Sequence, residues 1–94
     1  MNILVVGLSH KTAPVEIREK IAFSPTAMAE PLHKMLALES VSEALIVSTC
    51  NRVELYATSR DPERAVAQLR HFLADFHGLN FDQIDEHLYD LRGE

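Results

Sequence analysis

The sequence contains one cysteine, three glycines and no long apolar run, and each scarcity excludes a class of protein. A single cysteine cannot form a disulfide within the chain, which together with the missing signal-peptide pattern points to a reducing cytoplasm. No run approaches the roughly 18 apolar residues that a membrane-spanning helix needs. Gly7, Gly78 and Gly93 stand far apart, so the glycine-rich turn that holds a dinucleotide or a phosphate is missing. We expect Gly7 to mark a close backbone contact or a bulge within a strand.

Positive charge is also scarce, because 9 Lys and Arg face 14 Asp and Glu, for a net charge of −5. Residues 1–60 carry six of each sign, whereas residues 61–94 carry three basic and eight acidic side chains. Proteins that bind phosphate backbones cluster Lys and Arg, and no such stripe is present. The composition therefore gives no independent case for nucleic-acid binding.

What remains is the composition of one small globular domain spanning residues 1–94. The chain has 94 residues, of which 47% are hydrophobic and 24% charged, and its mean hydropathy is −0.04. These values argue against disorder and allow one modest core.

Apolar periodicity predicts four strands and three helical segments. Short apolar or alternating runs mark the strands Ile3–Leu8, Ala44–Ser48, Val53–Thr58 and Leu88–Leu91. Capping residues and prolines mark helices over Pro14–Phe23, from Ser24-Pro25 onward, and from Asp61-Pro62 to Gly78. Pro31 lies inside the second of these and predicts a kink.

The order of these segments is β-α-β-β-α-β, which predicts an α+β fold of the ferredoxin-like (split β-α-β) kind. Its four-stranded antiparallel sheet carries the helices on one face. We expect the first strand to run parallel to the third, which places His10 about 20 Å from Cys50 at roughly 3.3 Å per residue. That separation argues against a Cys–His catalytic pair, and so against a cysteine hydrolase.

The remaining histidines do not have the spacing of metal ligands, so no metal site is predicted. His71 and His77 lie on different faces of one helix. His77, just before Gly78, is placed to interact with the negative end of that helix.

Cys50 lies in the polar joint of a predicted hairpin, where a thiol is accessible. Arg52 supplies positive charge, which either favours the thiolate of Cys50 or holds a substrate carboxylate. The N–H groups of the turn are candidates to favour the thiolate as well, or to bind an oxyanion. A lone intracellular cysteine is otherwise usually an inert apolar residue. Both alternatives stay open on the residues alone.

Two segments resemble a known family. Gly7–Glu19 (GLSHKTAPVEIRE) and Ser48–Tyr56 (STCNRVELY) resemble the N-terminal catalytic domain of the glutamyl-tRNA reductases. The resemblance covers essentially the whole chain.

The resemblance implies that Cys50 is a nucleophile that attacks the ester of glutamyl-tRNA(Glu) and forms a thioester. It implies that NADPH then reduces the thioester to glutamate-1-semialdehyde, the first step toward 5-aminolevulinate and the tetrapyrroles. Thr49, Asn51 and Arg52 match positions that line the glutamate site, and Arg52 is expected to bind a carboxylate.

The family also continues beyond this sequence, with a histidine soon after Glu94, an NADPH-binding domain and a helical dimerisation region. The chain is therefore expected to be an N-terminal part of a homodimeric enzyme that cannot complete the reaction alone. Glutamate-1-semialdehyde aminomutase is a further expected partner. The alternative is a non-enzymatic ferredoxin-like interaction or regulatory module with an inert cysteine.

Overall fold

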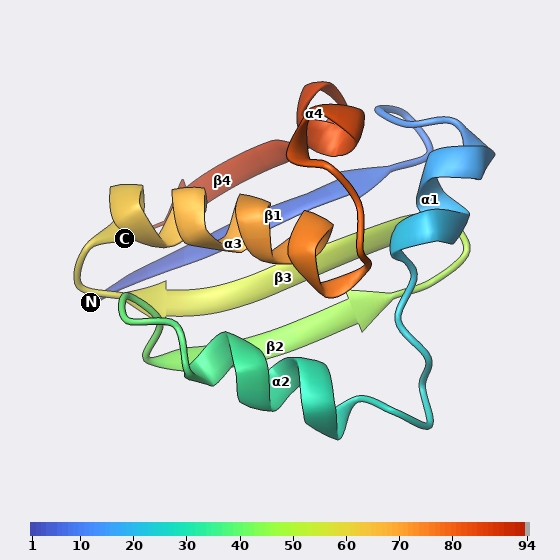
Figure 1. The fold of residues 1–94 in the computed structure, drawn as a ribbon. Helices are drawn as coiled ribbons and strands as arrows, with labels where there is room; N and C mark the ends of the chain where they lie inside the picture. Colours follow the sequence, from blue (N-terminus) through green and yellow to red (C-terminus); the bar gives the residue numbers. More distant parts are fainter. Residues whose placement is uncertain (94) are drawn as a thin grey trace.

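The computed structural model describes residues 1–93. Their strands form one four-stranded antiparallel sheet in the order β2-β3-β1-β4 (Figure 1). The predicted strands are all present. Their bounds are Asn2–Ser9 (β1), Glu43–Ser48 (β2), Arg52–Ser59 (β3) and Tyr89–Gly93 (β4).

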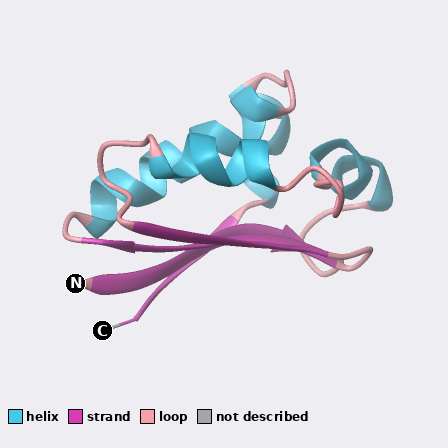
Figure 2. Cartoon of the chain, turned by 90° about the horizontal axis from the view of Figure 1, so that it is seen from below, coloured by secondary structure: helices cyan, strands magenta, loops and turns pink. Residues whose placement is uncertain are grey.

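The helices all cover one face of this sheet, as predicted, and leave the other face open (Figure 2). Their bounds are Val15–Ile21 (α1), Ala29–Leu36 (α2), Pro62–Phe76 (α3) and Phe81–Ile84 (α4), and Asp85–His87 forms a 3₁₀ turn (η1). The α+β, ferredoxin-like fold is confirmed. Within residues 1–93, none of the helices combines the length and the apolar character that crossing a bilayer demands.

The predicted direction of the first strand is wrong. β1 runs antiparallel to β3, with Ser9 opposite Arg52 and Asn2 opposite Ser59. The reason is that β3 reverses direction in the hairpin after β2 and then inserts between β2 and β1, so it opposes both neighbours. The end of β1 therefore lies beside the start of β3.

The predicted start of the second helix is also wrong. Ser24 and Thr26 form a turn in which their hydroxyl oxygens lie 3.1 Å apart, and α2 begins only at Ala29. Pro31 thus lies in the first helical turn, where its missing N–H has no partner to lose. This start avoids the kink that a helix beginning at Pro25 would need.

The segment of α4 and η1 was not predicted, because four-residue helices are too short for periodicity. It does have a local signal. Asn80 and Gln83 form a capping box, in which each side chain accepts a hydrogen bond from the other residue's N–H.

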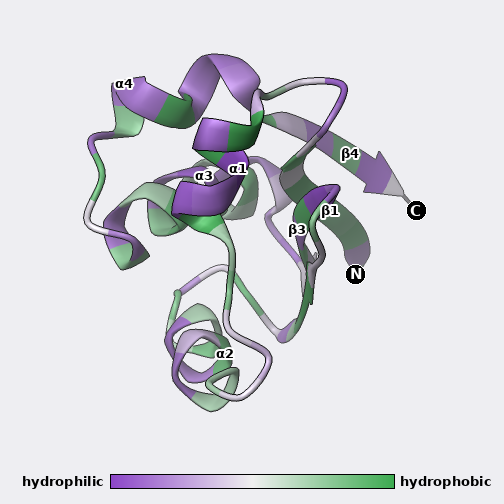
Figure 3. Cartoon of the chain, turned by 90° about the vertical axis from the view of Figure 1, so that its right-hand side faces the viewer, coloured by the Kyte–Doolittle hydropathy of each residue, from purple (hydrophilic) through white to green (hydrophobic). Residues whose placement is uncertain are grey.

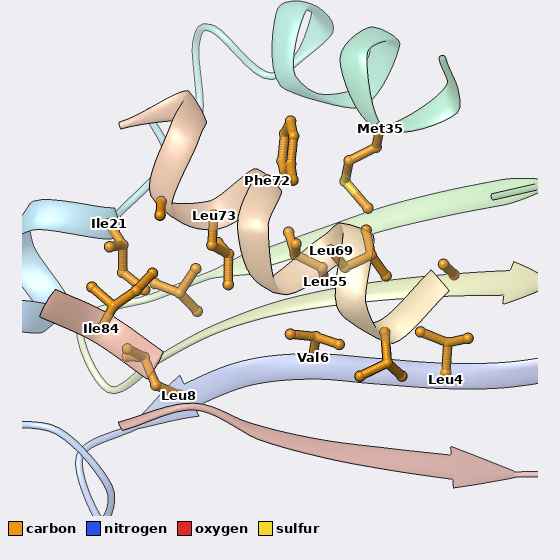
Figure 4. Close-up of a cluster of buried hydrophobic side chains, with 14 of the residues drawn as sticks. Leu4, Val6, Leu8, Ile21, Met35, Leu55, Leu69, Phe72, Leu73 and Ile84 are labelled. Atoms are coloured by element: carbon orange, nitrogen blue, oxygen red, sulfur yellow. The ribbon is translucent and has the colours of Figure 1, made fainter. Parts of the chain in front are cut away.

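The core lies between the helices and the inner face of the sheet (Figure 4). Its fully buried side chains come from β1, β3, α3 and the shorter helices, and include Leu4, Val6, Leu8, Ile21, Met35, Val53, Leu55, Leu69, Leu73 and Ile84. As predicted, Val53, Leu55 and Ala57 are the buried apolar side chains of β3, whereas Phe76, predicted as buried, is only partly so. His77 lies at the C-terminal end of α3, where its Nδ1 is 2.8 Å from the Leu73 carbonyl oxygen, the position that the sequence predicted.

Gly7 is required by close packing, as the sequence indicates. A Cβ atom built there would overlap the Val53 carbonyl oxygen and lie 2.8 Å from the Glu54 Cα and 2.9 Å from its Cγ. Two of these atoms are backbone and cannot move aside without disturbing the β1–β3 pairing. Gly93 lacks this crowding, since its nearest atom would be 3.8 Å away.

We predict that Gly7→Ala lowers the free energy of unfolding by about 1–3 kcal/mol, because an overpacked side chain must displace backbone. The matched control Gly93→Ala, also in a strand, is expected to change it by less than about 0.5 kcal/mol. Urea unfolding followed by circular dichroism measures both. Equal values for the two variants would contradict the packing argument.

Candidate functional site

The turn between β2 and β3 carries the predicted site residues. Thr49, Cys50 and Asn51 join the two strands, and Cys50 is exposed at the tip. The Thr49 N–H donates to the Arg52 carbonyl (2.8 Å), and the Thr49 hydroxyl oxygen lies 3.2 Å from the N–H nitrogens of both Asn51 and Arg52. A side chain that accepts from the next residues in this way is a common stabiliser of tight turns. The prediction that the thiol is accessible is confirmed.

These hydrogen bonds correct one expectation. The N–H groups of Asn51 and Arg52 donate to the Thr49 hydroxyl, so they cannot also bind an oxyanion or stabilise a thiolate while the turn is intact. Side chains are therefore the candidates to supply positive charge near Cys50.

The loop after β1 lies against this turn. The His10 N–H donates to the Asn51 carbonyl oxygen at 2.7 Å, which extends the β1–β3 pairing by one residue. The predicted 20 Å separation of His10 from Cys50 is therefore wrong, for the reason already given for the strand direction. The two segments that resemble the reductase family meet at this end of the sheet.

The same loop is closed by its own polar groups. The Ser9 N–H donates to the Thr12 hydroxyl (3.0 Å), the Lys11 N–H donates to the Ser9 hydroxyl (3.2 Å), and the Ala13 N–H donates to the Ser9 carbonyl (2.9 Å). His87 Nδ1 lies 3.1 Å from the Thr12 carbonyl oxygen and joins η1 to the loop. These contacts hold the loop in one conformation beside the turn formed by Thr49, Cys50 and Asn51, which we call the cysteine turn.

Arg18 of α1 contacts both the loop after β1 and the turn between β2 and β3, a contact that no sequence pattern predicted. Its Nε donates to the Cys50 carbonyl oxygen at 3.2 Å, and its Nη1 donates to the Ala13 carbonyl oxygen at 2.7 Å. Figure 3 looks onto this end of the molecule, where α1 lies beside β1 and β3 on the helix side of the sheet.

On the open face of the sheet, Arg52 lies at one end of a polar cluster that the sequence did not predict. Glu54 is only 6% exposed, and its carboxylate accepts hydrogen bonds from the Tyr56 hydroxyl at 2.9 Å and the Tyr89 hydroxyl at 2.5 Å. Arg52 Nη1 lies 3.7 Å from the same carboxylate. The alternation Arg-x-Glu-x-Tyr along β3 is the signal that puts three of these side chains on one face.

The cluster is held in place from the helix side by Arg70. Its two terminal nitrogens lie 2.9 Å from an Asp85 carboxylate oxygen and 2.8 Å from one of Asp90. Asp90 neighbours Tyr89 in β4, so this pair fixes the strand that supplies the second phenol.

Both phenols are held in their protonated form. The hydrogen bond to Glu54 is the main reason that the pKa of Tyr56 is raised above its usual value of 10.0, and burial adds to it. For Tyr89 burial is the larger cause, the hydrogen bond to Glu54 is the second, and the pKa is raised further. A buried carboxylate is stabilised by such donors only while they keep their protons.

Residues 6–94 match the family model described as "Glutamyl-tRNAGlu reductase, N-terminal domain". The glutamyl-tRNA reductase of Geotalea uraniireducens is 60% identical over 94 residues, which is 100% of this chain and 22% of that protein. That of Geobacter sulfurreducens is 58% identical with the same coverage. The solved structure of glutamyl-tRNA reductase from Methanopyrus kandleri matches 97% of this chain and 19% of its own, with a TM-score of 0.65 and 27% identity.

The fold and these matches define the class of the chain as an α+β N-terminal domain of an oxidoreductase family. The family is glutamyl-tRNA reductase, and the chain belongs to it. The chain spans about 22% of the length of the curated relatives it matches.

The two raised tyrosine pKa values make stability depend on alkaline pH. A phenol whose pKa is raised on folding stabilises the fold below its unfolded value of about 10, and this contribution is lost as pH rises above 10. We predict that the free energy of unfolding falls less steeply above pH 10 in Tyr89→Phe than in the wild type. Urea unfolding at pH 8–11 measures the slopes, and parallel slopes would contradict the raised pKa of Tyr89.

Proposed function

We propose that this chain supplies the nucleophile and part of the glutamate site of a glutamyl-tRNA reductase, which opens tetrapyrrole synthesis. The observation that carries the proposal is the meeting of the two family-like segments around an exposed cysteine. The His10 N–H bonds to the Asn51 carbonyl, and Arg18 bonds to the carbonyl of Cys50 itself.

Cys50 is placed to act on a bulky substrate. It lies at the tip of a turn, where the ester at the end of a charged tRNA can approach. In the proposed step the thiolate sulfur bonds to the ester carbonyl carbon, the bond from that carbon to the ribose oxygen breaks, and the oxygen takes a proton. The product is a thioester, which accepts hydride more readily than an oxygen ester because sulfur donates less electron density to the carbonyl.

Arg52 is the proposed binding residue for a carboxylate of the glutamyl group. Its side chain is 53% exposed, so it can meet a substrate, and Glu54 lies 3.7 Å away on the sheet. A planar guanidinium binds a carboxylate through two parallel hydrogen bonds. Thr49 shapes the turn through its hydroxyl, and Asn51 presents a polar side chain at the tip; both are proposed to line the same site.

The described residues do not fit NADPH. Gly7 is packed against β3, Gly78 follows α3 with a φ of +69°, and Gly93 lies in β4, so no glycine-rich turn joins a strand to a helix. We therefore propose that NADPH binds outside this chain and derive no hydride step from these residues. Within residues 1–93 no three His, Cys, Asp or Glu side chains gather as metal ligands.

Residues 1–94 are proposed to form one domain of a longer cytoplasmic enzyme. Glutamyl-tRNA(Glu) is its proposed substrate, and the dimer contacts and any contact with glutamate-1-semialdehyde aminomutase are proposed to lie in other parts of that protein. The relatives are long enough for this, because the chain covers only 22% of their length.

Replacement of Cys50 by serine tests the nucleophile. We suggest a full-length chimera in which residues 1–94 replace the matching segment of the Geotalea uraniireducens relative, 60% identical over that segment. We predict that Cys50→Ser lowers the formation of semialdehyde from glutamyl-tRNA and NADPH about 1,000-fold or more, because a hydroxyl is a far weaker nucleophile than a thiolate.

The exchange is nearly isosteric at an exposed position, so the melting temperature should not change. An unchanged rate would show that Cys50 is not the nucleophile and would favour the interaction module with an inert cysteine.

Arg52→Lys tests the carboxylate contact. We predict that KM for glutamyl-tRNA rises about 10-fold, since an ammonium group cannot form the paired hydrogen bonds of a guanidinium. Thermal stability should barely change, because the side chain is 53% exposed and its ion pair is long at 3.7 Å. Arg60→Lys, exposed beyond the opposite end of β3, is the matched control. Equal losses of stability and activity in Arg52→Lys would indicate a structural arginine instead.

A further inference from the structure

Arg18 differs from most of the other arginines in its partners. Ion pairs with carboxylates occupy Arg52, Arg64, Arg70 and Arg92. Arg18 instead donates to two main-chain carbonyls, that of Cys50 at 3.2 Å and that of Ala13 at 2.7 Å. Within residues 1–93 no carboxylate forms an ion pair with Arg18, so its positive charge is not neutralised there.

The two acceptors lie on different segments. Ala13 ends the loop after β1, and Cys50 is the tip of the turn between β2 and β3, 32 positions away from Arg18 in the sequence. A planar guanidinium fixes the direction of each of its N–H bonds, so one side chain sets the spacing between the two segments. Arg18 lies on α1, a short helix of seven residues.

The contact also brings charge close to the thiol. The carbonyl oxygen and the sulfur of one cysteine are at most about 5 Å apart, so the guanidinium lies within about 8 Å of the sulfur, which is no more than a Debye length at physiological salt. The N–H groups of Asn51 and Arg52 are already used by Thr49. Arg18 is thus a source of positive charge that is fixed to the nucleophile's own backbone.

We propose that Arg18 is a positioning residue for Cys50. It fixes the backbone of the cysteine turn against the loop after β1, and its charge stabilises the thiolate. The expected effect of Arg18 on turnover rests on the proposed function. Its expected effect on the reactivity of the Cys50 thiol does not depend on the tRNA reaction.

Thiol reactivity is measured on the 94-residue chain, whose single cysteine makes alkylation specific for Cys50. We expect Arg18→Ala to slow alkylation by iodoacetamide at pH 7 about fivefold, and 20–50 mM guanidinium chloride to restore much of the rate. Urea and sodium chloride at the same concentrations should not restore it. Arg60→Ala is the control and should alkylate at the wild-type rate in every solution.

Turnover is measured in the full-length chimera. We expect Arg18→Ala and Arg18→Lys to lower kcat for semialdehyde formation about 10-fold or more while KM for glutamyl-tRNA stays within twofold, because a lysine cannot serve both carbonyls. Wild-type kcat in Arg18→Lys, or wild-type alkylation in Arg18→Ala, would overturn the proposal. A loss in Arg18→Ala that guanidinium does not rescue would overturn the charge role.

The two proposals fail separately. If Cys50→Ser keeps full turnover, the nucleophile assignment is wrong, whatever the Arg18 variants do. If Cys50→Ser is inactive and Arg18→Lys is fully active, only the positioning role is wrong. Should Arg18→Ala fail to fold, Arg18→Gln replaces it, because glutamine keeps an N–H donor without charge. Slow alkylation in Arg18→Gln supports the charge role, and alkylation at the wild-type rate refutes it.

Discussion

The antiparallel pairing of β1 with β3 is the constraint on which the other features depend. It runs from Asn2 opposite Ser59 to Ser9 opposite Arg52, and it continues into the His10–Asn51 hydrogen bond. On the inner face it aligns the apolar side chains that the helices cover, and at its end it brings together the loop after β1 and the cysteine turn. The core and the candidate site therefore both depend on this register, since a one-residue slip would move the apolar side chains of the slipped strand to the other face of the sheet.

The register is made possible by a position without a side chain. Gly7 lets the Glu54 backbone and side chain approach β1 closely, which buries a carboxylate on an otherwise open face. Burying a charge is costly unless donors surround it, and Tyr56 and Tyr89 supply two hydrogen bonds. Arg52 lies beside this fixed negative charge, so the orientation of the proposed carboxylate-binding residue traces back to a glycine on the neighbouring strand.

Local patterns predicted the elements well, and contacts between distant main-chain atoms explain what was missed. Short apolar or alternating runs located all four strands, and the Asp61-Pro62 cap located α3. The direction of β1 against β3 follows from the split β-α-β order, in which β3 lies between β1 and β2 and opposes both, so the wrong direction was an error about topology and not about local pattern. Thr49, Cys50, Asn51 and Arg52 were found together because they are adjacent in sequence. The Arg18 contact escaped notice because its acceptors are carbonyl oxygens, which every residue has, so no residue type marks them.

The two ion pairs of Arg70 bear on how β4 can separate from the rest of the domain. β4 is a short edge strand that pairs with β1, and its residues Leu91, Arg92 and Gly93 are exposed. Two ion pairs join it to α3: Arg70–Asp90, whose side chains are partly buried, and Arg92–Glu63, which is more exposed and is therefore the pair that salt weakens more. An opening confined to β4 would withdraw the Tyr89 phenol from Glu54 while the apolar interior between the helices and the sheet stays closed. Water would then reach a carboxylate that the folded domain keeps buried, without unfolding of the whole domain.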